Sequence, residues 1–177
     1  MKLFVDSADL ADIETIASWG VLSGVTTNPT LLGKVEGEAD EIYRRVCELV
    51  DGPVSAEVVT ESRGDMVEEG RRLAAIHPNI VVKLPMGAEA LAATSALAED
   101  DISVNMTLCF TAPQALLASA AGAAFVSPFV GRFDDIGQDG LEVLREVVEA
   151  LQPSMYDTEV LAASIRSPVH VTEAARM

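Results

Sequence analysis

Residues 79–85 of the chain read NIVVKLP. This apolar run is short, contains several β-branched residues and ends at a proline, a combination that indicates a buried strand. Lys83 stands inside the run, although lysine is almost never fully buried unless it has a partner. Its side chain must either point into the interior of the fold or extend along the strand to water. Which of these two orientations the Lys83 side chain takes depends on the fold of the rest of the chain.

Six further runs of the same kind lie before and after this one. The seven predicted strands are Lys2–Asp6, Gly24–Thr27, Val54–Val59, Ile80–Leu84, Ile102–Leu108, Ala124–Ser127 and Thr158–Ala163. Stretches with helical periodicity separate them, most clearly Asp65–Ile76 and Leu141–Leu151. Helix start signals stand at Ser7, Thr111 and Ser167. Strands that alternate with helices in this way are parallel and are covered by the helices.

Two architectures fit this alternation, an open doubly wound sheet and a closed barrel. The open sheet is usually marked by a Gly-rich phosphate loop after the first strand, where this chain has the residues DSAD, 6–9. We therefore predict the α/β class with a TIM-type (β/α)8 barrel, as a single domain over residues 1–177. The chain covers about seven βα units and lacks the eighth, which predicts a C-terminally incomplete domain. Either the chain is a fragment of a longer product or another chain covers the gap.

The composition excludes several classes of protein. Apolar residues make up 49% of the chain, which is enough to bury a core. The formal net charge of −16 argues against binding to nucleic acid or to an anionic membrane surface. This acidity indicates a solvated surface, with a saline cytoplasm as the alternative. Cys47 and Cys109 lack the spacing of metal ligands, so no metal is expected. The sequence shows no signal peptide and no apolar run long enough to span a bilayer, so we expect a cytoplasmic protein.

Every predicted strand ends at or beside a polar or charged side chain. In a β/α barrel the active site lies at the C-terminal ends of the strands. The residues at this level are Asp6, Thr26, Asn28, Glu57, Lys83, Asn105, Thr107, Ser127, Arg132, Ser164 and Arg166. Seven aligned polar ends are hard to explain by packing alone, so we predict an active site there.

Lys83 is the strongest candidate among these residues. Burial disfavours the charged ammonium and leaves a neutral amine that attacks carbonyl carbons. Strand alternation offers Glu57 and Asp6 as carboxyl groups in the same cavity, and proton transfer to or from a substrate hydroxyl needs such a group. Two alternatives stay open: a lysine that reaches water from a strand edge, and a Lys83–Glu57 ion pair that serves structure only.

Two arginines follow the sixth and seventh strands. The loops after the late strands of a barrel commonly hold phosphate. The guanidinium groups of Arg132 and Arg166, with Ser164 nearby, suit a phosphate monoester, and a pair of exposed arginines is the alternative. His77 and His170 lack partners with catalytic spacing, so we interpret both as structural.

Seven stretches of the chain, in order, match a known family. They are FVDSAD, GVTTNPTLL, VSAEVV, NIVVKLPM, SVNMTLCFTAPQALLA, AGAAFVSPFVGRFDDIGQDG and TEVLAASIRSP. Through them the chain resembles the small transaldolase and fructose-6-phosphate aldolase family over nearly all of its length. The resemblance implies a β/α barrel without metal or cofactor, sugar phosphates as small-molecule partners, and a homo-oligomer in the form of a ring of subunits.

The resemblance also implies a reaction. Lys83 would form a Schiff base with a ketose phosphate, either fructose 6-phosphate or sedoheptulose 7-phosphate. It would then carry a dihydroxyacetone unit to an aldose phosphate, as a transaldolase of the pentose phosphate pathway does. Asp6 would move the proton of the hydroxyl at the bond that breaks, while Glu57 and Thr107 would hold a water that works in imine formation and release. The implied substrate-binding residues are Thr26, Asn28, Asn105, Ser127, Phe129, Arg132, Ser164 and Arg166.

Two positions bear on the subtype. The fructose-6-phosphate aldolases of the family have Gln where this chain has Glu57 and Tyr where it has Phe129. A phenylalanine lacks the phenol that could protonate the carbanionic intermediate, so the intermediate should survive until an aldehyde acceptor arrives. Transaldolase is therefore favoured over the aldolase alternative. A third hypothesis, from another class, is an inactive barrel fragment that acts as an assembly module.

Overall fold

The computed structural model describes residues 1–152 and 157–177. The chain divides into two compact units, an N-terminal unit, Met1–Lys83, and a C-terminal unit, Leu84–Met177. The boundary falls inside one strand, so each unit contains part of it. In the part of the chain that the structure describes, no helix is both long and apolar enough to cross a membrane.

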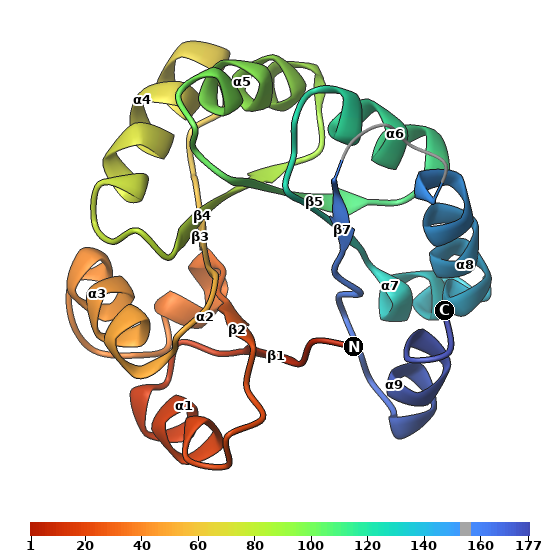
Figure 1. Cartoon of the computed structure of the whole chain (residues 1–177), viewed down its shortest axis with the longest axis horizontal. Helices are drawn as coiled ribbons and strands as arrows, with labels where there is room; N and C mark the ends of the chain where they lie inside the picture. The colour runs from red at the N-terminus through yellow and green to blue at the C-terminus, as the bar shows by residue number, and fades with distance from the viewer. Residues whose placement is uncertain (153–156) are drawn as a thin grey trace. The chain divides into compact units, whose positions relative to one another are not determined.

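The N-terminal unit is built from four parallel strands and the helices between them. Its elements are β1 (Phe4–Asp6), α1 (Leu10–Ala17), β2 (Gly24–Thr26), α2 (Pro29–Leu32), α3 (Ala39–Leu49), β3 (Val54–Glu57), α4 (Arg63–Ala74) and the start of β4 (Ile80–Pro85). The strands pair in sequence order, with Val25 opposite Val54 and Glu57 opposite Lys83. Helices α1, α3 and α4 lie on one side of these strands (Figure 1).

The core of this unit lies between the strands and those three helices. Val25, Val54 and Val82 from the strands and Ile13 and Val46 from the helices are fully buried. Valine and isoleucine suit a strand or a strand-facing helix position because their branched side chains pack well on a pleated surface. Burial of each such side chain contributes about 1.5–3 kcal/mol, which fixes the strand ends that carry the polar residues.

The C-terminal unit repeats the pattern. Its elements are α5 (Ala88–Glu99), β5 (Val104–Cys109), α6 (Ala112–Ala120), β6 (Phe125–Pro128), α7 (Val130–Asp135), α8 (Gly140–Leu151), β7 (Glu159–Val160) and α9 (Pro168–Ala174). Strands β5, β6 and β7 are parallel and pair in that order. Val104, Met106 and Val126 are fully buried and form the strand side of the core.

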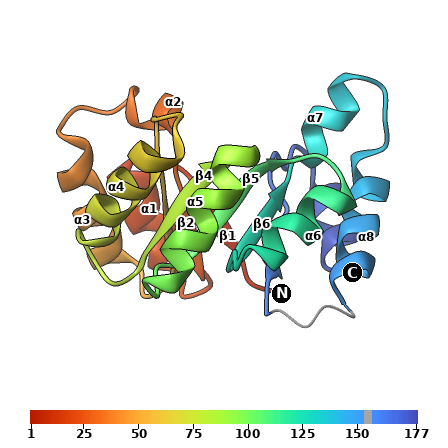
Figure 2. The same cartoon turned by 90° about the horizontal axis from the view of Figure 1, so that it is seen from above.

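The predicted alternation of strands and helices is confirmed, with differences at the strand ends. Two short helices, α2 and α7, were not predicted, and each begins just after a strand, at the carboxyl ends of β2 and β6 (Figure 2). β2 therefore ends at Thr26, one residue earlier than expected. β7 is also shorter than predicted, although Ala163 still forms an isolated bridge with Phe129.

The helix start signals are confirmed at two of three positions. The hydroxyls of Thr111 and Ser167 accept backbone N–H bonds in the first turns of α6 and α9. The prediction for Ser7 is wrong, because Asp9 caps α1 with its carboxylate, which accepts from two backbone N–H groups of that helix. The Ser7 hydroxyl instead accepts from the N–H of Asp9 and so shapes the turn before the helix.

Candidate active site

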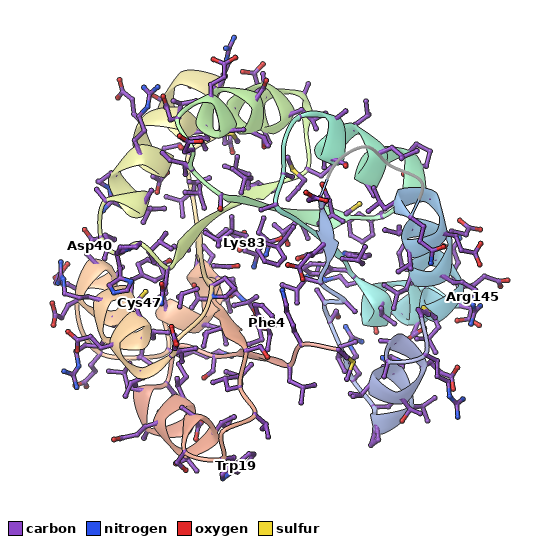
Figure 3. All side chains as sticks on the ribbon, in the orientation of Figure 1. Phe4, Trp19, Asp40, Cys47, Lys83 and Arg145 are labelled. Carbon is purple, nitrogen blue, oxygen red and sulfur yellow. The ribbon has the colours of Figure 1, made fainter. Side chains whose placement is uncertain are left out.

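Lys83 is held inside the N-terminal unit between a carboxylate and a carbonyl. Only 6% of the residue is exposed. Its Nζ lies 2.8 Å from Glu57 Oε2 and donates to the backbone oxygen of Thr27 at 2.9 Å. In Figure 3 it lies on the far side of β3 and β4 from α3. The alternative in which this lysine reaches water is therefore wrong.

The sheet register explains why this pair forms. Glu57 is the last residue of β3 and lies directly opposite Lys83 of β4, and side chains of directly paired residues project from the same face. Val82 and Leu84 project to the other face, where both are fully buried. A buried ion pair repays its desolvation cost only with good geometry and additional hydrogen bonds, and the Thr27 carbonyl supplies one.

Asp6 is the last residue of β1, at the strand end where the sequence places it. It lies opposite Thr26 in the register of β1 and β2, and its Oδ1 accepts from the Thr26 hydroxyl at 2.8 Å. The Asp6 residue is exposed, so of the two predicted carboxyl groups only Glu57 contacts Lys83. Asn28 lies two residues after the end of β2 and caps α2, since its Oδ1 accepts from the backbone N–H of Leu31 at 3.0 Å.

The C-terminal unit brings three other predicted residues into its interior. Asn105 and Ser127 are buried, and the serine hydroxyl donates to Asn105 Oδ1 at 2.7 Å. Thr107 is 1% exposed, and its hydroxyl has no partner among the described residues. The register of β5 shifts just after it, with Leu108 at a φ of 55°, a conformation that a leucine rarely adopts. Bulges of this kind aim a side chain and are common beside active sites.

Phe129 and Arg132 contact each other at the carboxyl end of β6. The guanidinium carbon of Arg132 lies 5.4 Å from the centre of the Phe129 ring, which is a cation–π contact. The same ring packs against Phe110 with the ring centres 6.2 Å apart. Phe129 therefore positions one of the two arginines predicted to bind phosphate, a role that its sequence position did not indicate.

The second arginine, Arg166, has a partner that was not predicted. Its guanidinium group binds both carboxylate oxygens of Asp135 in α7, with Nη2 2.8 Å from Oδ2. The hydrogen bond with Arg166 lowers the pKa of Asp135, so this carboxylate stays ionised. Ser164 lies at a φ of 57° and its carbonyl accepts from the N–H of Gly131. A Cβ on Gly131 would stand 2.5 Å from Arg166 Nε, so only glycine lets the arginine pass there.

His170 joins this segment of the C-terminal unit. Its Nε2 lies 3.2 Å from a carboxylate oxygen of Asp134, and its Nδ1 accepts from the backbone N–H of Arg166 at 3.3 Å. These contacts tie α9 to α7, which fits the structural role predicted for this histidine. Among the described residues, no three His, Cys, Asp or Glu side chains gather to hold a metal ion.

A family model and several curated proteins match this chain. The model of the transaldolase/fructose-6-phosphate aldolase family matches residues 3–177. A protein of Thermus thermophilus named "Probable transaldolase" is 58% identical over 99% of this chain and 82% of its own length. A protein of Myxococcus xanthus with the same name is 51% identical over 100% of this chain and 80% of its own.

Two solved structures share the fold at low sequence identity. An orotidine 5'-phosphate decarboxylase from Pyrococcus horikoshii superposes with a TM-score of 0.67 and 13% identity over 98% of this chain and 85% of that one. A mandelate oxidase mutant superposes with a TM-score of 0.64 and 17% identity over 98% of this chain and 60% of that one. Identities this low show the fold alone. They support the predicted TIM-type β/α barrel class, of which this chain supplies seven βα units.

Proposed function

The chain belongs to the transaldolase/fructose-6-phosphate aldolase family, and from this premise we propose that it is a transaldolase that works through a Schiff base on Lys83. Family membership makes it an enzyme of the aldolase and aldehyde–ketone transferase type. The observation that carries the finer proposal is the buried Lys83 ammonium, fixed 2.8 Å from the carboxylate of Glu57. No other lysine of the N-terminal unit stands in a strand of the structure.

Imine formation begins with removal of a proton from the ammonium, because only the neutral amine attacks a carbonyl carbon. Glu57 is in direct contact with Nζ and accepts that proton. The amine then adds to the C2 carbonyl of the ketose phosphate, and the protonated Glu57 returns the proton to the carbinolamine hydroxyl, which leaves as water. One amine hydrogen moves to the former carbonyl oxygen in the carbinolamine, and the products of this step are the protonated imine, one water and the Glu57 carboxylate.

Transfer follows from the imine. A carboxylate takes the proton of the C4 hydroxyl, the C3–C4 bond breaks, and its electron pair moves into the imine to give an enamine. The freed aldose phosphate departs, and the enamine attacks the carbonyl carbon of a second aldose phosphate, whose oxygen takes the proton back. We assign the carboxylate of Asp6 to this proton transfer, as the family resemblance implies. Water then hydrolyses the new imine.

The remaining roles also come from the family resemblance. Thr107 is assigned to the water of imine formation and release, a role supported by its buried hydroxyl, which has no partner among the described residues. Thr26, Asn28, Asn105, Ser127 and Phe129 are assigned to the donor fragment. Arg132, Ser164 and Arg166 are assigned to the substrate phosphate. Sugar phosphates as partners, a homo-oligomer, a cytoplasmic location and a place in the pentose phosphate pathway stay predictions from the sequence.

The test of this proposal is borohydride reduction in the presence of fructose 6-phosphate, followed by mass analysis of the peptides. A reduced adduct on the peptide that contains Lys83 is expected. Lys83→Arg keeps the positive charge but removes the amine nucleophile, and it should give no adduct. An adduct on Lys2 or Lys34 alone, or none from folded protein, would refute the assignment.

The aldolase alternative has a separate test. A transaldolase transfers from fructose 6-phosphate to erythrose 4-phosphate and releases little dihydroxyacetone when no acceptor is present. An aldolase of this family releases dihydroxyacetone at a comparable rate under both conditions. The acidic residue at position 57 and the phenylalanine at position 129 support the transaldolase outcome. The hypothesis of an inactive assembly module predicts neither product.

A further inference from the structure

The carboxylate of Glu69 accepts three hydrogen bonds from the segment that follows Glu57. Glu69 belongs to α4 and is half-buried. Its Oε2 accepts from the backbone N–H groups of Val59 and Thr60, each at 3.2 Å, and from the Thr60 hydroxyl at 2.8 Å. Hydrogen bonds to a carboxylate are about twice as strong as those between neutral groups. The proposed reaction gives Glu69 no role, so these three contacts need another explanation.

The donors are the first backbone groups beyond the sheet. β3 ends at Glu57, and the N–H of Val58 still donates to the carbonyl of Lys83 at 3.1 Å, so β4 holds the chain up to that residue. The two N–H groups that come next are the ones that Glu69 binds. The backbone after Glu57 is therefore attached first to β4 and then to α4.

Side-chain packing holds this segment only in part. Val59 is 68% exposed and Thr60 is half-buried. In α4, by contrast, Met66 and Leu73 stand three residues before and four residues after Glu69, on the same side of the helix, and both are buried. The helix is thus fixed by its core contacts, and the hydrogen bonds of its carboxylate hold the exposed segment to it.

We infer that Glu69 is a positioning residue for Glu57, holding the backbone after β3 so that the Glu57 carboxylate stays at the Lys83 ammonium. The contact maintained in this way is the 2.8 Å between Glu57 Oε2 and Lys83 Nζ. The inference rests on the function proposed for Lys83, because the pair exchanges a proton during imine formation. Glu69 acts through the backbone of Val59 and Thr60, and all five residues lie within the N-terminal unit.

The test compares Glu69→Ala with Asp139→Ala as a matched control. Asp139 Oδ1 accepts from the backbone N–H groups of Leu141 and Glu142 at 3.0 and 3.3 Å, so each variant removes a carboxylate that binds two backbone N–H groups. Each should lower the melting temperature by about 2–6 °C. Only Glu69→Ala should lower kcat for transfer, by about tenfold with KM within about twofold, because a misplaced Glu57 slows proton transfer more than it weakens substrate binding.

Glu69→Gln separates hydrogen bonding from charge. Its amide oxygen still accepts N–H bonds, so this variant should keep kcat within about threefold of the parent protein. A kcat as low as that of Glu69→Ala would overturn the inference, because the reaction would then depend on the negative charge at this position rather than on the hydrogen bonds.

A spectroscopic readout makes the test independent of the proposed reaction. The chain has three lysines, so protein labelled with 13Cε-lysine gives three signals, and Lys83→Arg identifies the one of interest. Glu69→Ala should move the Lys83 signal and leave the other two in place, whereas Asp139→Ala should move none. If Glu69→Ala does not fold, Thr60→Val, which removes one of the three hydrogen bonds, should move the Lys83 signal by less, and Thr60→Ser, which keeps the hydroxyl, should not move it.

The outcomes separate the two ideas. A Lys83 signal and a kcat that match the parent protein in Glu69→Ala, despite a lower melting temperature, would overturn the inference and leave Glu69 a structural role. If the parent protein forms no borohydride adduct, the function proposed for Lys83 fails, while the Lys83 signal of Glu69→Ala still decides whether Glu69 holds the pair.

Discussion

At the scale of single residues, the Lys83–Glu57 pair is a buried ion pair in which each charge is stabilised by the other. The side chains are 7% and 17% exposed, so removal of one partner leaves the other charge poorly solvated. We expect Glu57→Gln and Lys83→Met each to lower the free energy of unfolding by about 2–4 kcal/mol. The double variant should lose less than the sum, with a coupling of at least about 1 kcal/mol.

Urea unfolding of the parent, the two single variants and the double variant measures this coupling. The matched control is the Asp40–Arg72 pair, which has the same short contact but side chains about half exposed. A cycle with Asp40→Asn and Arg72→Met should give a coupling below about 1 kcal/mol, because solvent screens exposed pairs. Equal couplings in the two cycles would contradict the distinction between them.

Lys83 and Glu57 could be predicted from the sequence, but Thr27, the other residue that contacts the ammonium, could not. The lysine in an apolar strand and the glutamate in the preceding strand are chemically unusual there, so both could be predicted. Thr27 was passed over because its contribution to Lys83 is a backbone carbonyl, which every residue type has.

At the scale of elements, α7 depends on a glycine in its first turn. A Cβ on Gly131 would meet the carbonyl of Ser164 and the Nε of Arg166, each at 2.5 Å. Gly131→Ala should therefore lower the free energy of unfolding by about 1–3 kcal/mol, as overpacking does. Gly64→Ala, in the first turn of α4 with nothing within 4 Å, should instead stabilise by about 0.5–1 kcal/mol. Denaturant unfolding of both variants tests the contrast, and stabilisation by both would contradict it.

The Asp135–Arg166 contact between α7 and the segment before α9 bears on phosphate binding. Asp135 occupies both ends of the guanidinium fork that a phosphate would need. Because its pKa lies below the ordinary 3.8, the carboxylate competes at every pH above that value and is lost as a competitor only in stronger acid. Asp135→Asn should lower KM for fructose 6-phosphate about two- to fivefold at pH 7, with kcat unchanged.

The control for that prediction is a donor without a phosphate. Fructose, or dihydroxyacetone offered with an aldehyde, should show the same KM in the parent protein and in Asp135→Asn. A rise in KM for fructose 6-phosphate would show the opposite role for Asp135, in which the carboxylate holds Arg166 in position rather than competing with phosphate. Sequence spacing gave no sign of this contact, since the two residues are 31 positions apart.

Helices and strands could be predicted from the sequence where their apolar pattern extends over enough residues to be recognised. The seven strands and the helices between them follow from apolar runs and helical periodicity, whereas α2 and α7 have four and six residues, too few for a period to register. The cap of α1 was misplaced because Ser7 and Asp9 are both good capping residues, and only the backbone path selects Asp9. The alternation of strands and helices was therefore enough to predict the fold class, whereas the turns and the short helices became visible only in the structure.

At the scale of the whole molecule, the dominant feature is an excess of 16 negative charges, from 28 acids and 12 bases. Such self-repulsion destabilises the compact state, and salt screens it, with a Debye length that falls from about 10 Å at 0.1 M to about 3 Å at 1 M. Salt also weakens surface ion pairs such as Arg45–Glu48, but each contributes only about 0–1 kcal/mol. Repulsion should win, so we expect the melting temperature to rise by several degrees between about 0.05 and about 1 M sodium chloride.

Calorimetry or circular dichroism in a sodium chloride series measures this rise. Chloride is the suitable anion, because sulfate stabilises proteins by exclusion from their surface whatever their charge. The same series nearer the isoelectric point of about 4.3 provides the control, since a smaller net charge leaves less repulsion to screen and the rise should shrink. A melting temperature that is highest at the lowest salt concentration would mean that the ion pairs outweigh the excess charge, and that the acidic surface is not an adaptation to a saline cytoplasm.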